Sequence, residues 1–340
     1  MLYNFFGRCN YYINIRKEFL YWIILKYLHV IQLKILLKKY VKKLELKCGK
    51  KEAFKFKNDN TFVKILETVR EDDVFVVQTI KPPIDERIME LLITLDALKR
   101  ASPKRITAVL PYFPYSRSDK KDQPRVPITA KLVADLIVTA GADRILTCDL
   151  HNAAIQGFIT VPSDQLKAKD ILTDYFRKIA EKEKVVVVAT DAGSTKKAYK
   201  YAEELNTSIA MIDKRRNGND DRAIASHVIG DVKDRVCIIF DDEIDTAGSM
   251  MESIRTLKEN GAIKIYAACT HAILSGPAIE RLKTVDIEEL VVTNTVPIPQ
   301  EKILPNIKIL DIAALFGKTI LNIHNGKGVG ELFKDKKMEF

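Results

Sequence analysis

Short apolar segments alternate with amphipathic ones from Asp73 almost to the C-terminus, and this alternation limits the fold more than any other feature. The predicted strands cover residues 73–79, 105–113, 144–150, 184–190, 208–212, 236–240, 264–270 and 289–295. The predicted helices cover residues 86–101, 128–141, 194–206, 249–261 and 310–326. Short, buried strands that alternate with helices are typical of parallel sheets covered by helices on both faces. The expected fold class is therefore α/β.

The chain has 340 residues, which is enough for two domains that each bury a core of their own. The strands and helices form two series of similar order, although no sequence repeat relates them. We expect two similar α/β domains with parallel sheets flanked by helices. The first covers residues 51–170 and is completed by a C-terminal helix at 312–334, the second covers 171–311, and residues 1–50 form a basic, apolar extension.

The charge of the chain is unevenly distributed. The net charge is +10, but residues 1–55 hold 13 Lys and Arg against 3 Asp and Glu, so the remainder holds 42 of each sign. A body without basic excess argues against nucleic acid as a partner. The five scattered cysteines include no CxxC pair, which indicates a reducing compartment such as the cytoplasm and argues against a thiolate zinc site.

The apolar stretch at residues 21–43 is interrupted by Lys26, His29 and Lys34, so we expect no transmembrane segment. One interpretation is an amphipathic helix that packs on the body of the protein. The other is an organelle-targeting segment or a helix that lies on a membrane surface.

Four carboxylates follow the predicted strand at 236–240, and small residues follow them in turn. Ligands of such sheets bind beyond the carboxyl ends of the strands. Gly248 lets the backbone approach a ligand, and the hydroxyls of Thr246 and Ser249 with the nearby N–H groups suit a phosphate monoester. Carboxylates such as Asp241 and Asp242 accept hydrogen bonds from sugar hydroxyls. The segment therefore predicts a site for a phosphorylated pentose.

A second loop, at 191–195, follows the four-valine strand and precedes a helix. Its N–H groups could bind an anion, and Asp191 could hold a divalent cation on that anion. The loop lacks the GxxxxGK[ST] and GxGxxG patterns, and it is equally typical of a helix N-cap in a tight turn.

Three cations, Lys214 to Arg216, follow the predicted strand at 208–212 and precede a Gly- and Asn-rich segment. They could stabilise a phosphoryl group during transfer. A solvated run of charge is the other interpretation.

Two more strand-end loops remain ambiguous in isolation. Residues 111–122 bring two tyrosines, a phenylalanine and several cations that could stack a base and contact phosphates, but they also suit a surface loop. Asp149 and His151 would lie on the same side of an extended chain and could reach one ion, although a buried, hydrogen-bonded histidine is the commoner outcome.

Taken together, these loops resemble a known family. The segment "VCIIFDDEIDTAGS" is similar to the phosphoribosyl-diphosphate loop shared by type I phosphoribosyltransferases and ribose-phosphate diphosphokinases. The segments "PYFPYSRSDKKD", "TCDLHNAAIQGF", "TDAGSTKKA", "IDKRRNGN" and "CTHAILSGPAIERL" resemble, in order, the ribose-phosphate diphosphokinase (phosphoribosyl pyrophosphate synthetase) family. The resemblance covers about residues 56 to 333. It implies a type I phosphoribosyltransferase-like fold and transfer of the β,γ-diphosphoryl group of ATP to the C1 hydroxyl of ribose 5-phosphate, which releases AMP.

The resemblance also implies a role for each motif. The catalytic cations would be Lys214 and Arg216. ATP would contact Phe56, Asn58, Asn60, Arg117, Ser118, Asp119, Lys120, Lys121 and Asp122. Ribose 5-phosphate would contact Asp241, Asp242, Asp245, Thr246, Ala247, Gly248 and Ser249. The diphosphate would lie on Asp191, Ala192, Gly193, Ser194 and Thr195. Mg²⁺ would be held by His151 and Asp191, with Asp149 and Asp164 as further candidates. ATP would bind at a subunit interface of a homo-oligomer of the hexamer-of-dimers type.

Some positions depart from the family pattern. Ser194 and Lys197 stand where the family has glycine and arginine, and residues 1–55 lack the family's first strand with its Ser-Gly-Asn turn. The missing first strand favours one alternative to the enzyme, a catalytically weak regulatory subunit that joins active subunits. A second alternative is a phosphoribosyltransferase.

Overall fold

The computed structural model describes residues 11–15, 21–23, 47–216 and 224–333. The chain divides into two compact units. Unit 1 consists of Met1–Leu166, Thr295–Pro297 and Asp311–Phe340, and unit 2 consists of Lys167–Asn294 and Ile298–Leu310.

The sheet of unit 1 has seven strands in the order β2-β3-β1-β6-β7-β8-β9. The strands are β1 (Tyr11–Ile15), β2 (Tyr21–Ile23), β3 (Lys47–Cys48), β6 (Asp73–Val77), β7 (Arg105–Leu110), β8 (Arg144–Cys148) and β9 (Ser163–Leu166). From β6 to β9 the strands are parallel, whereas β1 pairs with β6 in the antiparallel direction. Residues 1–55 therefore contribute an edge strand beside β6, although they lack the Ser-Gly-Asn turn of the family.

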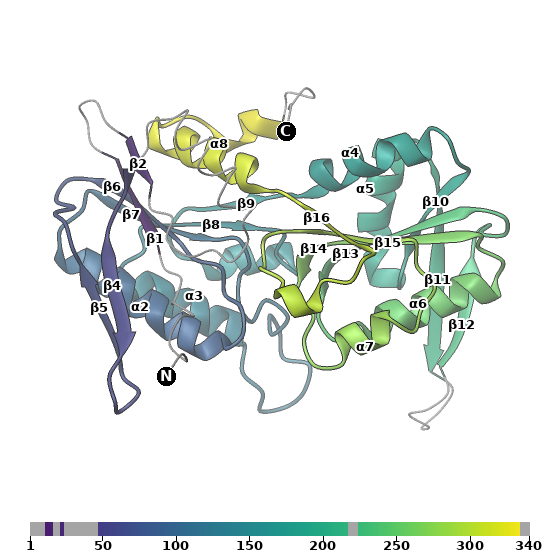
Figure 1. Cartoon of the computed structure of the whole chain (residues 1–340), viewed down its shortest axis with the longest axis horizontal. Helices are drawn as coiled ribbons and strands as arrows, with labels where there is room; N and C mark the ends of the chain where they lie inside the picture. The colour runs from purple at the N-terminus through teal and green to yellow at the C-terminus, as the bar shows by residue number, and fades with distance from the viewer. Residues whose placement is uncertain (1–10, 16–20, 24–46, 217–223, 334–340) are drawn as a thin grey trace. The chain divides into compact units, whose positions relative to one another are not determined.

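Helices cover both faces of this sheet. They are α2 (Ile84–Arg100), α3 (Thr129–Ala140) and α8 (Ala313–His324), with short 3₁₀ helices η1 (Ala153–Phe158) and η4 (Val329–Phe333). Figure 1 shows α2 and α3 on one face and α8 on the other. Leu91, Leu95 and Leu98 of α2 are fully buried at the i, i+4, i+7 spacing of an amphipathic helix. Their burial against the sheet is worth about 1.5–3 kcal/mol per side chain.

A hairpin of β4 (Lys51–Lys55) and β5 (Thr61–Ile65) forms a separate two-stranded sheet and lies against α2 (Figure 1). Its five-residue tip, Phe56–Asn60, carries three of the predicted ATP-binding residues. The position of this tip therefore depends on contacts between the hairpin and the helix.

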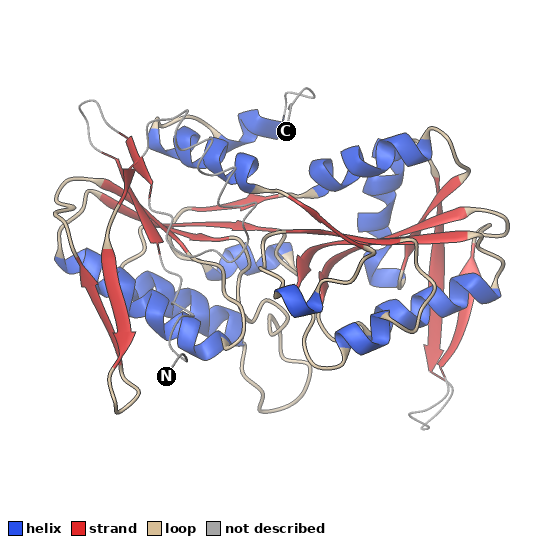
Figure 2. Cartoon of the chain, in the orientation of Figure 1, coloured by secondary structure: helices blue, strands red, loops and turns tan. Residues whose placement is uncertain are grey.

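The sheet of unit 2 has seven strands in the order β12-β11-β10-β13-β14-β15-β16. They are β10 (Val185–Ala189), β11 (Ser208–Arg216), β12 (Ile224–Ile229), β13 (Val236–Ile244), β14 (Lys264–Ala272), β15 (Glu289–Thr293) and β16 (Ile307–Leu310). All pairs are parallel except β11 with β12. The helices are α4 (Lys169–Ala180), α5 (Thr195–Leu205), α6 (Gly248–Glu259) and α7 (Ala278–Leu282), with η2 (Ala192–Ser194) and η3 (Gln300–Lys302). Figure 2 shows them on both faces of the sheet.

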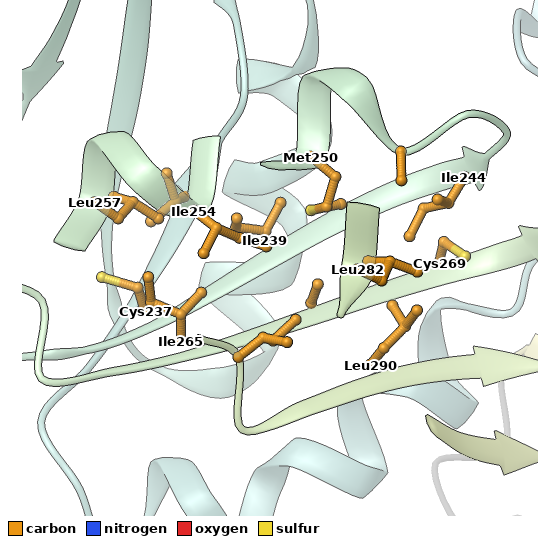
Figure 3. Close-up of a cluster of buried hydrophobic side chains, with 14 of the residues drawn as sticks. Cys237, Ile239, Ile244, Met250, Ile254, Leu257, Ile265, Cys269, Leu282 and Leu290 are labelled. Atoms are coloured by element: carbon orange, nitrogen blue, oxygen red, sulfur yellow. The ribbon is translucent and has the colours of Figure 1, made fainter. Parts of the chain in front are cut away.

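The core of unit 2 lies between α6, α7 and the sheet. Figure 3 shows Met250, Ile254 and Leu257 of α6 pointing toward Cys237 and Ile239 of β13. These five side chains are at most 3% exposed. Because the same apolar stripe fixes α6 on the sheet, it also fixes the N-terminus of α6 beside the carboxyl end of β13.

Two strands extend beyond their predicted ends. β11 continues through Arg216 because it pairs with β12, and β13 continues through Ile244 because it pairs with β14. Lys214 and Asp241 therefore lie in strands, whereas the sequence placed both in loops.

In the predicted N-terminal helix at 21–43, Tyr21–Ile23 form a strand and the other positions lie outside the described residues. None of the described helices combines the length and apolar character needed to cross a membrane.

Candidate active site

The carboxyl end of β13 brings together two carboxylates and a lysine from another element. Lys197 of α5 donates from Nζ to Oδ1 of Asp242 at 2.6 Å, and the Asp242 side chain is 9% exposed. The backbone N–H of Asp242 donates to Oδ1 of Asp241 at 2.8 Å. The two predicted sugar-binding carboxylates are therefore held in a shared network before any ligand binds.

The network leaves Asp241 easy to protonate. Burial and the charge of Asp242 together raise the pKa of Asp241 to about 7, against the opposing charge of Lys197. A carboxyl group in this state can donate or accept a hydrogen bond near neutral pH. Either role suits a sugar hydroxyl, which is both donor and acceptor.

The turn from β13 into α6 has the geometry of an anion site. Ala247 is left-handed (φ 60°, ψ 10°) and directly precedes Gly248, the first residue of the 12-residue helix α6. Consecutive left- and right-handed residues aim successive N–H groups at one point, and the helix N-terminus adds a partial positive charge. As N-cap residue, Ala247 has no side-chain oxygen that could accept a hydrogen bond from these N–H groups.

A neighbouring segment holds this turn in place. Arg281 of α7 donates from Nη1 to the carbonyl oxygen of Thr246 at 2.9 Å, and a Cβ on Gly248 would lie 3.4 Å from the same Nη1. The hydroxyl of Ser275 bonds to Oδ1 of Asp245, and its N–H donates to the Asp245 carbonyl oxygen at 3.0 Å. A guanidinium beside a turn of open N–H groups favours a bound phosphate.

The second strand-end loop of unit 2 runs from β10 into α5. Oδ1 of Asp191 accepts a hydrogen bond from the N–H of Ser194 at 2.7 Å, and Oγ of Ser194 accepts one from the N–H of Asp191 at 3.2 Å. This reciprocal pair is a capping box, so the N-cap interpretation of the sequence is correct. Asp191, Ala192 and Gly193 are exposed at the start of the helix, where an anion would also bind.

The predicted catalytic pair lies in β11. The backbone of Lys214 pairs with Ser226 and that of Arg216 with Ile224. The side chains of both residues lie outside the described part of the structure.

In the loop at 111–122 of unit 1, the structure contradicts the predicted role of two aromatic rings and leaves the predicted phosphate-binding cations exposed. Tyr112 is 7% exposed and Phe113 is 1% exposed, and Tyr115 donates its hydroxyl to Oδ1 of Asp85 at 2.6 Å. The prediction that these rings stack a base is therefore wrong for Tyr112 and Phe113, which belong to the core. Arg117, Lys120, Lys121 and Asp122 are exposed, and Ser118 and Asp119 are half-buried.

One contact joins this loop to the Asp-x-His segment. Asn152 donates from Nδ2 to Oδ2 of Asp119 at 2.7 Å, so two of the predicted motifs of unit 1 lie side by side. Asp149 has φ 36°, so the chain is not extended there. The argument that an extended chain places Asp149 and His151 on the same side therefore does not apply. Asp164 lies in β9 and forms an ion pair with Arg144.

Within the described ranges, no group of three or more His, Cys, Asp or Glu side chains could hold a metal ion. Of the predicted ligands, His151, Asp149 and Asp164 belong to unit 1, and Asp191 belongs to unit 2.

Two residues that contact the predicted site have no role in the sequence prediction. They are Lys197, which bonds to Asp242, and Arg281, which bonds to Thr246. Lys197 could have been found from the sequence, because it is a cation on the face of α5 that is directed toward the sheet. No local pattern connects Arg281 to Thr246, which lies 35 positions earlier.

Comparisons with known proteins agree on one family. Residues 25–141 match the model of the N-terminal domain of ribose phosphate pyrophosphokinase, and residues 219–334 match the phosphoribosyl synthetase-associated domain. The chain is 47% identical over 302 residues to a ribose-phosphate pyrophosphokinase of Clostridium perfringens, covering 88% of this chain and 94% of the relative.

It is 43% identical over 293 residues to ribose-phosphate pyrophosphokinase 1 of Listeria monocytogenes, covering 86% of this chain and 92% of the relative. The crystal structure of phosphoribosylpyrophosphate synthetase from Mycobacterium smegmatis superposes with a TM-score of 0.81 at 42% identity, covering 86% of this chain and 96% of the other.

Proposed function

The chain belongs to the ribose-phosphate pyrophosphokinase family, and we infer that it transfers the β,γ-diphosphoryl group of ATP to the C1 hydroxyl of ribose 5-phosphate. The bond between the α- and β-phosphates of ATP breaks, and a bond forms from the C1 oxygen to the β-phosphorus. The hydroxyl proton is released, and the products are 5-phosphoribosyl 1-diphosphate and AMP. The single observation that carries the residue assignment is the strand–turn–helix segment from Asp241 to Ser249.

This segment offers one subsite for each end of the sugar phosphate. The 5-phosphate would bind the N–H groups that Ala247 and Gly248 present at the start of α6, close to the Arg281 guanidinium. The ribose hydroxyls would bind Asp241 and Asp242. Lys197 supports this arrangement, because it offsets the negative charge that two adjacent carboxylates would otherwise bring near a phosphate.

The remaining unit 2 motifs would act on the diphosphoryl group. The segment Asp191–Thr195, which forms η2 and leads into α5, exposes Asp191, Ala192 and Gly193 and suits the transferred diphosphate. Lys214 and Arg216 would stabilise the charge on the phosphoryl oxygens in the transition state. Such transfer needs positioning and charge stabilisation rather than a covalent nucleophile.

ATP would bind through unit 1. The exposed cations of the 117–122 loop suit its phosphates, and the exposed ring of Phe56 at the hairpin tip suits its adenine. Asn58 and Asn60, which flank Asp59 in this tip, would supply polar contacts to the base.

Mg²⁺ is proposed as the metal. The ion usually binds one or two carboxylates together with substrate phosphates and water, so a site of few protein ligands fits it. The exposed carboxylate of Asp191 and the exposed imidazole of His151 suit such a role, whereas Asp164 is already paired with Arg144. When bound, the ion would neutralise charge on the polyphosphate.

The proposal also covers the assembly and the compartment. Family membership supports a homo-oligomer, and the buried thiols of Cys148, Cys237 and Cys269, which form no disulfide, suit a reducing compartment. The names of the relatives favour the enzyme over a regulatory subunit, and the high coverage by a synthetase structure favours it over a phosphoribosyltransferase.

The test is to incubate the purified protein with ATP, ribose 5-phosphate and Mg²⁺ and to quantify AMP and sugar diphosphate. We expect equal amounts of the two products and no AMP when the sugar phosphate is omitted. ADP in place of AMP, or products formed only when a nucleobase is added, would contradict the proposal.

A further inference from the structure

Among the strands that the structure describes, β4 and β5 pair only with each other and form a two-stranded sheet apart from the main sheet of unit 1. A hairpin of this size is at best marginally stable alone. Contacts with α2 must therefore determine where its tip lies.

Alternate residues of β4 are partly buried: Lys51, Ala53 and Lys55 are half-buried, whereas Glu52 and Phe54 are exposed. At the base of the hairpin, Lys51 donates from Nζ to Oγ1 of Thr94 at 3.1 Å. This ammonium also lies 3.7 Å from Oε1 of Glu90, and both side chains of that pair are 4% exposed. Burial lowers the pKa of Lys51 to about 8, against the opposing effect of Glu90. The base of the hairpin is thus attached to α2 through a buried polar contact.

A second lysine makes the corresponding contact at the tip. Nζ of Lys55 lies 2.8 Å from Oδ1 of Asp59 and 3.1 Å from Oε1 of Glu86 in the first turn of α2. Asp59 is the left-handed residue of the turn (φ 66°), and its N–H donates to the carbonyl oxygen of Phe56 at 2.9 Å. One ammonium therefore joins the turn to the helix.

We propose that Lys55 is a positioning residue for the nucleotide, an inference that depends on the proposed function. Through Asp59 and Glu86 it holds the Phe56–Asn60 turn in place before ATP binds. A turn that is already ordered loses less conformational entropy when the nucleotide binds, so the affinity for ATP is higher. Because the Lys55 ammonium is paired with the carboxylates of Asp59 and Glu86, it can act through the turn without contacting the nucleotide.

The experiment compares Lys55→Met with Lys57→Met in steady-state kinetics. Lys57 is exposed on the same turn, so its variant removes the same charge from the same place. We expect Lys55→Met to raise KM for ATP about 3- to 5-fold, the upper part of the range for exposed ion pairs, with kcat and KM for ribose 5-phosphate within about twofold. We expect Lys57→Met to change KM for ATP less than about twofold and Lys55→Arg to restore most of the affinity.

Glu86→Gln separates positioning from direct contact by the sign of its effect. If Lys55 acts through Glu86, this variant raises KM for ATP even though it removes a negative charge. If Lys55 instead binds the ATP phosphates directly, release from Glu86 strengthens that contact and KM falls. Equal effects of Lys55→Met and Lys57→Met, or a lower KM in Glu86→Gln, would overturn the inference.

Hydrogen exchange of the 56–60 peptide gives a readout that is independent of catalysis. It should accelerate in Lys55→Met and Glu86→Gln but not in Lys57→Met, and unchanged exchange in all three variants would overturn the inference. A wild-type protein that forms no AMP would instead refute the proposed function, so the two failures are distinguishable.

Discussion

Lys197→Met tests the electrostatic network at the end of β13. The substitution keeps most of the aliphatic stem but removes the ammonium that lies 2.6 Å from Oδ1 of Asp242. Two adjacent carboxylates, Asp241 and Asp242, then remain without this counter-charge at the end of a buried strand. We expect unit 2 to become less stable, and the loss to depend on pH.

The magnitude follows from the burial of the pair. The Lys197 side chain is 38% exposed and that of Asp242 is 9% exposed, so the pair is intermediate between an exposed and a fully buried ion pair. Exposed pairs contribute up to about 1 kcal/mol, and truncating one partner of a fully buried pair costs about 3–5 kcal/mol. Because solvent screens the partly exposed lysine, we expect Lys197→Met to lower the free energy of unfolding by about 1–2 kcal/mol. This corresponds to an equilibrium constant for opening that is about 5- to 30-fold larger.

The pH dependence has a definite sign. Because the pKa of Asp241 in the folded state is raised from 3.8 to about 7, its stabilising contribution is fully present below pH 3.8 and is lost as pH rises through 7. Lys197 lowers that pKa, so its removal raises the pKa further and favours the protonated carboxyl more strongly. The deficit of Lys197→Met should therefore be larger at pH 8 than at pH 5.5.

Hydrogen exchange of peptides from β13 and α6, corrected for the intrinsic rate at each pH, measures the local opening free energy in unit 2. Lys200→Met removes an exposed charge from the same helix and serves as the control. An equal deficit at both pH values, or the same effect in the control, would refute the reasoning.

Three further predictions concern activity. Lys214→Ala should lower kcat by about two to three orders of magnitude and leave the Kd of ribose 5-phosphate nearly unchanged in calorimetry. A parallel loss of binding would exclude a role confined to the transition state. Arg281→Met should weaken binding of ribose 5-phosphate by about tenfold, as expected for a hydrogen bond to a charged group, while binding of ribose itself stays the same. If ribose binding falls equally, Arg281 does not act on the phosphate. Chelation of Mg²⁺ should abolish AMP formation in the wild type and added Mg²⁺ should restore it; full activity in excess chelator would contradict the metal assignment.

Local pattern was enough to predict the α/β class and the positions of the strand-end loops. The four-valine strand β10 and the apolar residues 236–240 of β13 are all buried, as their composition indicates. The stripe of Met250, Ile254 and Leu257 predicts a helix after the Asp-Thr-Ala-Gly-Ser segment, and α6 begins at Gly248, within that segment. The comparisons confirm the family that these motifs resemble.

Features that depend on pairing partners escaped prediction. The polar strand β9, the edge strand β12 and the strand β16 have no long apolar run, so only their neighbours in the sheet stabilise them as strands. The helix α4 was overlooked although its apolar residues recur at helical spacing. The Lys197–Asp242 pair joins residues 45 positions apart, and no local pattern reports such a contact.

The account depends most on how the segment from Asp241 to Ser249 binds the sugar phosphate. A crystal structure of the complex with ribose 5-phosphate tests it directly. We predict the phosphate within hydrogen-bond distance of the N–H groups at the start of α6 and the ribose hydroxyls on Asp241 and Asp242. Ribose 5-phosphate bound elsewhere, with this segment unoccupied, would contradict the account.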